Sequence, residues 1–343
     1  MKLKQNKFGK ITIVFLLFAI LASMLALTGC ASKDPVQKSQ FMLDTNCTIT
    51  VYGKNADKLI DEGFALGTKY ENLLSTAIES SDVYKVNHAE GKPVQVSNDT
   101  IEILNKAISY SEKTDGLFDV SIGALTSLWD FPSGKKIVPK QAEIDKAKAT
   151  VGYKDIKIEG NIVTLLRPGA QLDFGGIAKG YIGDKIAGFL RESGVDGAIV
   201  NLGGNVVTVG KKPNGKPWNV GIQQPFADRN KTIGAVEVGE KDVVTSGIYE
   251  RSFTVDGKFY HHILDPRTGY PADNNLESVT IISNESGDGL TSSCFLLGEE
   301  RALKLVASFP NTEAIFVQKD GKIITSPGIG KTIPFQLASP QGN

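Results

Sequence analysis

A glycine-rich turn in the middle of the chain, Asp173-Phe-Gly-Gly-Ile-Ala-Lys-Gly180, constrains the fold more than any other feature. A short apolar stretch ends at Asp173 and residues with helical spacing follow Gly175-Gly176, so the segment predicts a turn from a strand into a helix. Glycine lets the backbone approach a ligand closely, and a helix N-terminus presents free N–H groups to an anion. The turn is therefore either a close packing contact or a phosphate site, and Lys179 in the first helical turn favours the phosphate.

The spacing within this turn excludes two common nucleotide-binding motifs. The segment has neither the Walker spacing nor the G-x-G-x-x-G spacing, so a P-loop and a Rossmann turn are excluded. Asp173-Phe-Gly175 matches the metal-binding triplet of protein kinases, but no H-R-D catalytic loop accompanies it, which excludes a kinase.

The rest of the chain predicts an α/β (α+β) protein with mixed sheets and flanking helices, in a single compact domain or in two subdomains around a cleft. No Pro- and Ser-rich linker divides the 343 residues, and a composition that is 41% apolar can bury a large core. Period-two alternation predicts strands at 41–52, 197–209, 219–223, 236–244, 252–264 and 278–282. Helical spacing and capping residues predict helices at 57–78, 98–114, 141–150, 178–193 and 288–297. Hairpins are expected around Glu159-Gly-Asn161 and, with turns of the preferred two-residue type, at Asp256-Gly257 and Asp320-Gly321.

The N-terminus has the layout of a bacterial lipoprotein signal. Four lysines precede an apolar run from Ile11 to Leu27, which ends in Leu27-Thr-Gly-Cys30. A transmembrane anchor would need about 20 apolar residues and has no reason to end in Leu-x-Gly-Cys. We therefore predict a signal peptide at 1–29, a lipidated Cys30 that begins a polar tether at 30–40, a folded domain at 41–330 and a C-terminal tail at 331–343.

This signal and the composition indicate where the protein works and with what. Two or more acyl chains hold a protein on a bilayer, so we expect a lipid anchor on the outer, extracytoplasmic face of the cell membrane. Removal of the four signal lysines leaves 34 basic against 38 acidic residues, which is no electrostatic signature of nucleic-acid binding. Cys47 and Cys294 have no partner at metal-ligand spacing, and two small buried thiols are favoured over a disulfide.

Asp288 and Ser292 form a candidate metal site. Asp288 stands at or beside the N-cap of a predicted helix, and the hydroxyl of Ser292 lies four residues later on the same face. A carboxylate and a hydroxyl, supplemented by carbonyls, waters and phosphate oxygens, suit Mg²⁺. An Asp with a Thr three residues later also makes an ordinary helix cap, so this stretch alone leaves capping open.

The histidines offer one candidate base. Only His88, His261 and His262 occur in the chain, which excludes a His-rich metal site. His262 ends a predicted strand just before the turn Leu264-Asp-Pro-Arg-Thr-Gly269, which would hold its ring at the rim of a sheet. An imidazole there with a nearly neutral pKa could remove a proton from an attacking hydroxyl, with Asp265 as the alternative base.

Several segments, in this order, resemble the ApbE-type FAD:protein FMN transferases over residues 41–326. They are Phe41-Met-Leu-Asp-Thr45, Ser81-Asp-Val-Tyr-Lys-Val-Asn87, Gly116-Leu-Phe-Asp-Val-Ser-Ile-Gly-Ala-Leu125, Asp173 to Gly180, Asn201-Leu-Gly-Gly204, Val244-Thr-Ser-Gly-Ile-Tyr249, His262 to Gly269 and Asp288-Gly-Leu-Thr-Ser292. Two positions depart from the family pattern. Leu43 stands where the family usually has Gly, which would narrow the opening of the site, and Ser292 stands where Thr is usual, which keeps the oxygen ligand.

The resemblance implies a site and a reaction. It implies Mg²⁺ held by Asp288, Thr291, Ser292 and the Gly176 carbonyl, and FAD contacted by Met42, Asp119, Val120, Ser121, Asp173, Lys179 and Ile263. In the implied reaction, a Thr or Ser hydroxyl of an extracytoplasmic acceptor protein attacks the FMN-side phosphorus of FAD and AMP departs, while His262 or Asp265 takes the proton. A metal-dependent FAD pyrophosphatase and a flavin-binding lipoprotein without turnover stay open as alternatives.

Overall fold

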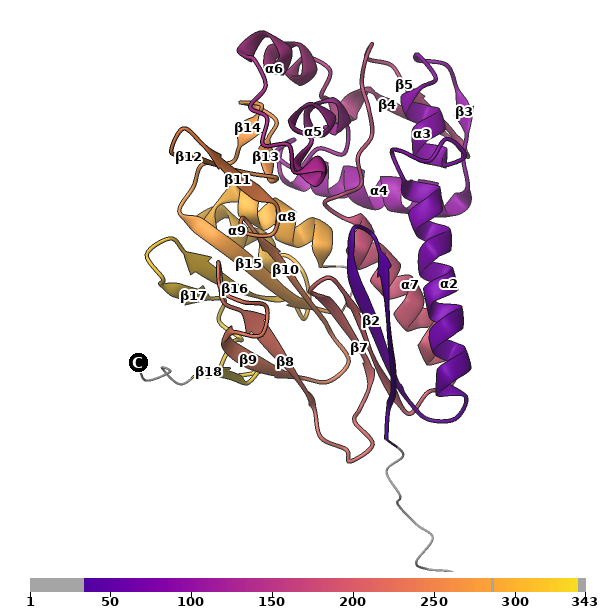
Figure 1. Cartoon of the computed structure of the whole chain (residues 1–343), viewed down its shortest axis with the longest axis vertical. Coiled ribbons are helices and arrows are strands. Elements are labelled where there is room, and N and C mark those ends of the chain that lie inside the picture. The colour runs from indigo at the N-terminus through magenta and orange to yellow at the C-terminus, as the bar shows by residue number, and fades with distance from the viewer. Residues whose placement is uncertain (1–33, 285–286, 339–343) are drawn as a thin grey trace, which may run out of the picture. The chain divides into compact units, whose positions relative to one another are not determined.

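The computed structural model describes residues 34–284 and 287–338 (Figure 1), and from Pro35 onward these residues belong to one compact unit rather than to two subdomains. The predicted signal peptide and Cys30 lie outside the described residues. Within the described part of the chain, no helix combines the length and the apolar composition that crossing a membrane requires.

An eight-stranded sheet forms the centre of this unit, with the strand order β1-β2-β6-β7-β10-β15-β16-β17. Its strands are β1 (Val36–Met42), β2 (Thr45–Tyr52), β6 (Gly197–Leu202), β7 (Asn205–Gly210), β10 (Asp242–Gly247), β15 (Leu276–Ser283), β16 (Glu313–Gln318) and β17 (Ile323–Thr325). All pairings between named strands are antiparallel, where the sequence analysis expected mixed sheets. Antiparallel neighbours need only short turns between them, and several strands here follow one another as hairpins.

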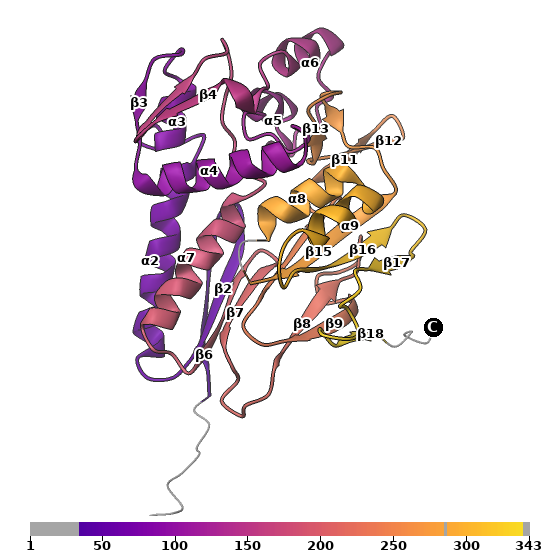
Figure 2. The same cartoon turned by 180° about the vertical axis from the view of Figure 1, so that it is seen from behind.

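Helices cover one face of this sheet and a small sheet covers the other (Figures 1 and 2). The helices are α2 (Ala56–Leu74), α7 (Ala178–Glu192), α8 (Asp288–Leu297) and α9 (Glu299–Ala307). The small sheet contains β8 (Trp218–Gln223), β9 (Thr232–Val238) and β18 (Phe335–Leu337). Side chains alternate between these layers as a strand requires: Ile281 packs with α8 and α9, whereas Ile282 packs with β8 and β9.

The remaining elements lie at the end of the sheet where the candidate site forms. They are α3 (Asp82–Asn87), β3 (Val94–Gln95), α4 (Asn98–Lys113), α5 (Gly123–Trp129), α6 (Gln141–Lys148), β4 (Ile156–Glu159), β5 (Ile162–Leu165), β11 (Ser252–Val255), β12 (Lys258–His261), β13 (Leu264–Asp265) and β14 (Tyr270–Pro271), with short 3₁₀ turns at Phe131–Ser133 and Tyr153–Asp155. Trp129 of α5 and Ile144 of α6 pack against Phe253 and Tyr260 of the β11–β12 hairpin. This packing joins the hairpin to the helical part of the fold.

Three of the predicted strands were wrong in the same way, because each is interrupted by a turn that was not expected. The segment 41–52 contains the end of β1 and all of β2, and the segments 197–209 and 236–244 are divided likewise. The segment 252–264 is also divided, at the Asp256-Gly257 turn that the sequence predicted. Leu43 and Asp44 between β1 and β2 both have φ of +55°, and the β6–β7 turn contains Gly203 and Gly204 at positive φ. Apolar alternation continues through such tight turns, so the pattern alone does not reveal them.

The predicted helices were closer to the structure, although three short ones were missed. The helix predicted at 57–78 ends at Leu74, because Ser75 is extended and its hydroxyl accepts the N–H groups of Ala77 and Ile78. The helices predicted at 98–114, 141–150, 178–193 and 288–297 match α4, α6, α7 and α8 within two residues. Helices α3, α5 and α9 were not predicted, and the first two are too short for periodicity to detect.

The hairpin predictions had mixed outcomes. β4 and β5 form the expected hairpin around Glu159-Gly-Asn161. Asp256 and Gly257 both have positive φ, as the preferred two-residue turn requires. The turn at Asp320 is of another kind, because only Gly321 has positive φ and its N–H donates to the Gln318 carbonyl at 2.9 Å. That geometry is typical of a three-residue connection with a glycine bulge.

Two segments predicted as irregular contain strands. β1 begins at Val36, inside the predicted tether, and pairs along its whole length with β2. β18 lies inside the predicted C-terminal tail and pairs with β9. The structure also places Cys47 and Cys294 as buried free thiols, which agrees with the expectation for both.

Candidate active site

The glycine-rich turn predicted from the sequence connects to the start of α7. The Asp173 N–H donates to the Val120 carbonyl at 2.9 Å, which ties the turn to the segment before α5. The Asp173 carboxylate accepts the Gly175 N–H at 2.7 Å and the Thr126 hydroxyl at 2.5 Å. Asp173 thus shapes the turn through both of its oxygens.

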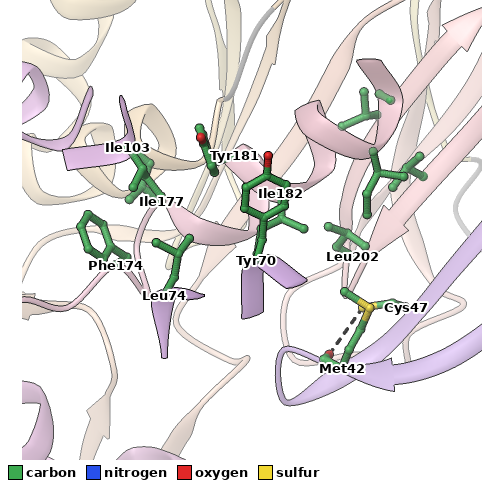
Figure 3. Packing of buried hydrophobic residues seen from close by; sticks show 14 of the residues in the cluster. Met42, Cys47, Tyr70, Leu74, Ile103, Phe174, Ile177, Tyr181, Ile182 and Leu202 are labelled. Atoms are coloured by element: carbon green, nitrogen blue, oxygen red, sulfur yellow. Dashed lines mark hydrogen bonds between the residues drawn. The ribbon is translucent and has the colours of Figure 1, made fainter. Parts of the chain in front are cut away.

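Close packing explains why the turn needs glycine at its centre. A Cβ on Gly176 would lie 3.1 Å from Cε2 of Phe118 and 3.4 Å from the Ser292 hydroxyl, so a side chain there would force its neighbours apart. Beneath the turn, Phe174 and Ile177 are buried beside Leu74 and Ile103 (Figure 3). The apolar residues fix the turn from below and leave the start of α7 facing the candidate site.

The N-terminus of α8 meets the N-terminus of α7. Oδ2 of Asp288 accepts the Gly180 N–H at 3.1 Å and lies 3.8 Å from Nζ of Lys179. The Ser292 hydroxyl donates to the Gly176 carbonyl at 3.3 Å. Asp288 does not cap its own helix through its side chain, so the alternative of an ordinary cap is wrong for this carboxylate. The fold therefore brings three of the four predicted metal ligands, Gly176, Asp288 and Ser292, to one place.

Thr291, the fourth predicted ligand, is held inside the protein. Its hydroxyl donates to the Asp288 carbonyl at 2.7 Å and accepts a hydrogen bond from Ser246 at 2.7 Å. Thr291 is fully buried. Ser246 was not singled out as a site residue, although it belongs to the Val244-Thr-Ser-Gly segment. Together the two hydroxyls fix the first turn of α8 against β10.

The ligand atoms at this point fit a hard cation. Across residues 34–284 and 287–338, no group of three or more His, Cys, Asp and Glu side chains gathers as a metal site would. One carboxylate, one carbonyl and one hydroxyl provide only oxygen ligands, whereas softer metals prefer sulfur and nitrogen. Oxygen ligands suit Mg²⁺, which keeps several waters and takes further oxygens from a phosphate. Lys179 adds a positive charge where an anion would sit.

His262 follows β12 directly, as predicted, but its pKa differs from the expectation. The His262 N–H donates to the Arg251 carbonyl at 3.0 Å, and Nδ1 lies 3.3 Å from the same oxygen. Burial, followed by the positive charges of Arg251, His261 and Lys179, lowers the pKa of His262 to about 3. The imidazole is therefore neutral at physiological pH, and the expected near-neutral pKa was wrong.

Asp265 is poorly suited to the role of a base. Its carboxylate receives the Arg267 guanidinium at 2.6 Å and the Arg267 backbone N–H at 2.9 Å. Burial alone would raise the pKa of Asp265, but the hydrogen bonds from Arg267 outweigh it and lower the pKa. A carboxylate that is occupied by its own turn in this way has little capacity to accept a proton, so we do not retain Asp265 as the alternative base.

His261 is also occupied inside the protein. Its Nε2 lies 3.0 Å from the Ala272 carbonyl, and burial lowers its pKa to about 4. The neighbouring Ile263 is buried in the core beneath α8 and α9. The Ile263 side chain packs with this core, so its predicted contact with FAD stays a prediction.

Three further predicted FAD contacts, Asp119, Val120 and Ser121, also have side chains directed into the protein. The Asp119 carboxylate accepts the Ser121 hydroxyl at 2.7 Å and the Tyr153 N–H at 2.9 Å, and Ser121 accepts the Gly152 N–H at 2.7 Å. Val120 is buried, and its carbonyl positions Asp173. In the structure these residues brace the glycine-rich turn, and direct contact of their side chains with FAD stays untested.

Met42 and the turn after it border the site. The Met42 side chain is buried near Gly67, and its carbonyl accepts the Cys47 thiol at 3.5 Å (Figure 3). Asp44 lies 3.5 Å from the Arg251 guanidinium, which connects the β1–β2 turn to the residue that holds His262. Sequence reasoning missed this contact, because Asp44 and Arg251 are far apart in the chain and no local pattern pairs them.

These features define an α+β protein with a candidate phosphate- and cation-binding site where the N-termini of α7 and α8 meet. The chain belongs to the ApbE family, whose model matches residues 43–316. It is 40% identical over 275 residues to the FAD:protein FMN transferase of Klebsiella pneumoniae (strain 342), which covers 79% of this chain and 85% of that relative. It is 32% identical over 335 residues to the FAD:protein FMN transferase of Treponema pallidum (strain Nichols), and this match covers 91% of this chain and 92% of that relative.

Solved structures agree with this assignment. The ApbE protein of Thermotoga maritima matches with a TM-score of 0.79 at 32% identity, over 86% of this chain and 97% of that chain. The flavin transferase ApbE of Vibrio cholerae matches with a TM-score of 0.76 at 28% identity, over 86% and 97%. The predicted family and the predicted α+β fold are confirmed.

Proposed function

We propose that this chain transfers the FMN moiety of FAD to a Thr or Ser hydroxyl of an acceptor protein and releases AMP. The observation that carries the proposal is the meeting of α7 and α8, where Lys179 and Asp288 lie beside the Gly176 carbonyl and the Ser292 hydroxyl. The names of the relatives in the ApbE family support the same reaction.

The start of α7 is the part that would bind the pyrophosphate of FAD. A helix N-terminus offers unpaired N–H groups and the positive end of the helix dipole. Lys179 adds a full charge in the first turn, and Gly175 is exposed, so a phosphate can approach the backbone there. Phosphoryl transfer depends mainly on positioning and charge stabilisation, which these groups supply.

A divalent cation would be held by Asp288, Ser292 and the Gly176 carbonyl, with Thr291 supporting them. Mg²⁺ bound there would neutralise charge on the phosphates as the leaving group departs. Lys179 would offset the Asp288 charge when no cation is present, since the two lie 3.8 Å apart.

His262 would take the proton of the attacking hydroxyl. With Nδ1 directed at the Arg251 carbonyl, the free acceptor is Nε2. The acceptor oxygen forms a bond to the FMN-side phosphorus, the bond from that phosphorus to the bridging oxygen breaks, and AMP leaves with that oxygen. The hydroxyl proton passes to His262. The anionic substrate would raise the affinity of His262 for this proton, because opposite charges favour the charged form of a base.

The protein would work on the outer face of the cell membrane, held there by a lipid on Cys30. The Leu27-Thr-Gly-Cys30 sequence after an apolar run supports this location. Replacement of Cys30 by Ser should move the protein from the membrane fraction to the soluble fraction or leave the signal uncleaved. An unchanged membrane fraction with normal processing would contradict the lipid anchor.

The experiment that tests the reaction mixes the purified protein with FAD, Mg²⁺ and a Thr-containing acceptor domain, and records both AMP release and the intact mass of the acceptor. We expect a mass gain of one FMN that depends on Mg²⁺ and is lost in Asp288→Ala. AMP release without a mass gain, in reactions with and without acceptor, would instead identify an FAD pyrophosphatase. Tight FAD binding with no AMP would identify a flavin-binding protein.

A further inference from the structure

An exposed aromatic pair lies on the surface beside the hairpin that leads to His262. Phe226, in the loop between β8 and β9, and Phe259, on β12, have ring centroids 5.8 Å apart, and the Phe226 ring lies 5.8 Å from Tyr249. The two phenylalanines are 56% and 38% exposed. Neighbouring apolar groups on a surface mark an interaction site more often than single ones do.

The backbone holds Phe226 outward in an unusual conformation. Its φ is +58°, a left-handed value that is rare for a bulky residue. The Gln224 N–H donates to the Lys231 carbonyl at 2.9 Å and the Ala227 N–H donates to the Gln224 carbonyl at 3.3 Å, which closes the loop around Phe226. Because more than half of the side chain faces solvent, its own burial offsets little of the strain.

The aromatic pair is continuous with the proposed transfer site. Phe259 lies three residues before His262, and its ring centroid is 6.1 Å from that of His261. Arg251, just before the paired strand β11, provides the carbonyl that accepts the His262 N–H at 3.0 Å. A polypeptide that lies across the aromatic pair can therefore follow the hairpin to His262.

The surroundings of the pair have the composition of a protein interface. Two ion pairs border it, Arg229 with Glu250 at 3.6 Å and Arg251 with Asp44 at 3.5 Å. An aromatic centre inside a polar rim is typical of surfaces that bind another protein, and aromatic residues often supply most of the binding energy there. Both signs of charge are present, so the rim does not favour a strongly charged partner.

We propose that Phe226 and Phe259 dock the acceptor polypeptide by packing against an apolar side chain close to its Thr or Ser. This inference rests on the proposed FMN transfer, which requires a second polypeptide at the site. The two exposed rings of Phe226 and Phe259 suit one apolar side chain of an extended segment rather than a large flat surface. The acceptor would thus be selected partly by what flanks its hydroxyl.

The test compares two short synthetic peptides that differ only in whether Leu or Asn flanks a central Thr. We expect the wild-type protein to transfer FMN to the Leu peptide with a KM about tenfold lower than for the Asn peptide, as expected for one apolar anchor. The double variant Phe226→Gly with Phe259→Thr should lose this preference. Gly relieves the left-handed strain, and Thr suits a strand position opposite Thr254, so both changes are compatible with the fold.

A matched control and a second readout separate docking from damage to the site. Leu166→Ser removes another exposed apolar side chain, next to β5, and should leave the Leu preference intact. FAD affinity, measured by flavin fluorescence, should be the same in all variants. A double variant that keeps the Leu preference, or that loses FAD affinity, would overturn the docking role. A wild-type protein that binds FAD but modifies neither peptide would overturn the FMN transfer to such segments, and the docking inference with it.

Discussion

Two buried carboxyl groups beside α7 lie in opposite surroundings. Asp288 accepts the Gly180 N–H and lies 3.8 Å from Lys179, so a donor and a cation face its charge. Asp242, at the start of β10, interacts with another carboxyl group, that of Asp184 on α7. Among the described residues, no hydrogen-bond partner reaches Oδ2 of Asp242. Burial, and then the charge of Asp184, raise the pKa of Asp242 to about 9.

The cavity around Asp242 differs from the α7–α8 site in its charges as well. It has a volume of about 290 Å³ and is lined by side chains of both charges, including Lys106, Asp184, Arg191 and Lys241. At the α7–α8 site, by contrast, the Gly180 N–H and the Lys179 ammonium group face the charge of the Asp288 carboxylate. Burial alone therefore does not make a carboxylate functional, because the neighbouring groups decide whether its negative charge is stabilised.

Asp288→Asn should cause the largest loss of activity. The amide can replace the carboxylate in shape but removes the charge that a cation needs, so we expect kcat/KM for FMN transfer to fall by about 100-fold or more. The acceptor mass assay measures this. Asp242→Asn is the control, and its activity should stay within about twofold of wild type because the cavity lies outside the proposed chemistry. Equal losses in the two variants would contradict the distinction.

His262→Gln should have the next largest effect. Loss of a general base costs about 100-fold or more in rate, while FAD affinity should be unchanged because the other groups remain. The lowered pKa of His262, about 3, also predicts how the free energy of unfolding depends on pH. Because the imidazole binds a proton more readily in the unfolded chain, the wild-type protein should become less stable as pH falls from about 6.5 towards 3. The Gln variant should lose less over this range in thermal unfolding. Full activity in His262→Gln would exclude His262 as the base.

Gly176→Ala disturbs the α7–α8 site without changing a charge. The added Cβ must displace the Phe118 ring, which lies 3.1 Å away, and we expect an activity loss of about tenfold from the misplaced carbonyl. Gly188→Ala is the matched control inside α7, the helix that follows the turn, where the nearest side-chain atom is in the Arg191 guanidinium at 4.0 Å. That change should raise stability by up to about 1 kcal/mol, since alanine is the better helix former. Comparable activities in the two variants would contradict the packing argument.

Asp242→Asn should have the smallest effect on activity but a distinct effect on stability. Because the folded protein binds the Asp242 proton more tightly than the unfolded chain, wild-type stability should fall as pH rises from about 4 to about 9. The Asn variant should be more stable than wild type at the upper end of this range, with Tm higher by about 2–4 °C for each kcal/mol gained. Parallel Tm profiles for the two proteins would show that Asp242 is charged in the folded state.

Part of the site could be predicted from the sequence, because it depends on features within short segments. The Gly175-Gly176 turn, the start of α7 and the cap-like position of Asp288 each depend on residues within one short segment. The interruption of the predicted strand at 41–52 was not accessible, because Leu43 and Asp44 adopt positive φ without a glycine to mark the turn. Short helices such as α5 also escaped detection, since seven residues give too little periodicity.

Motif order and local periodicity were enough to predict the family, the α+β composition and the residues that could bind phosphate and a cation. Which of those residues meet depends on the folded chain. The fold joined Asp288 to Gly180, assigned Asp265 to its own turn with Arg267 and held His262 on the Arg251 carbonyl. The physical reason is that pKa values, ligand sets and contacts depend on groups distant in the chain, and packing alone brings those groups together.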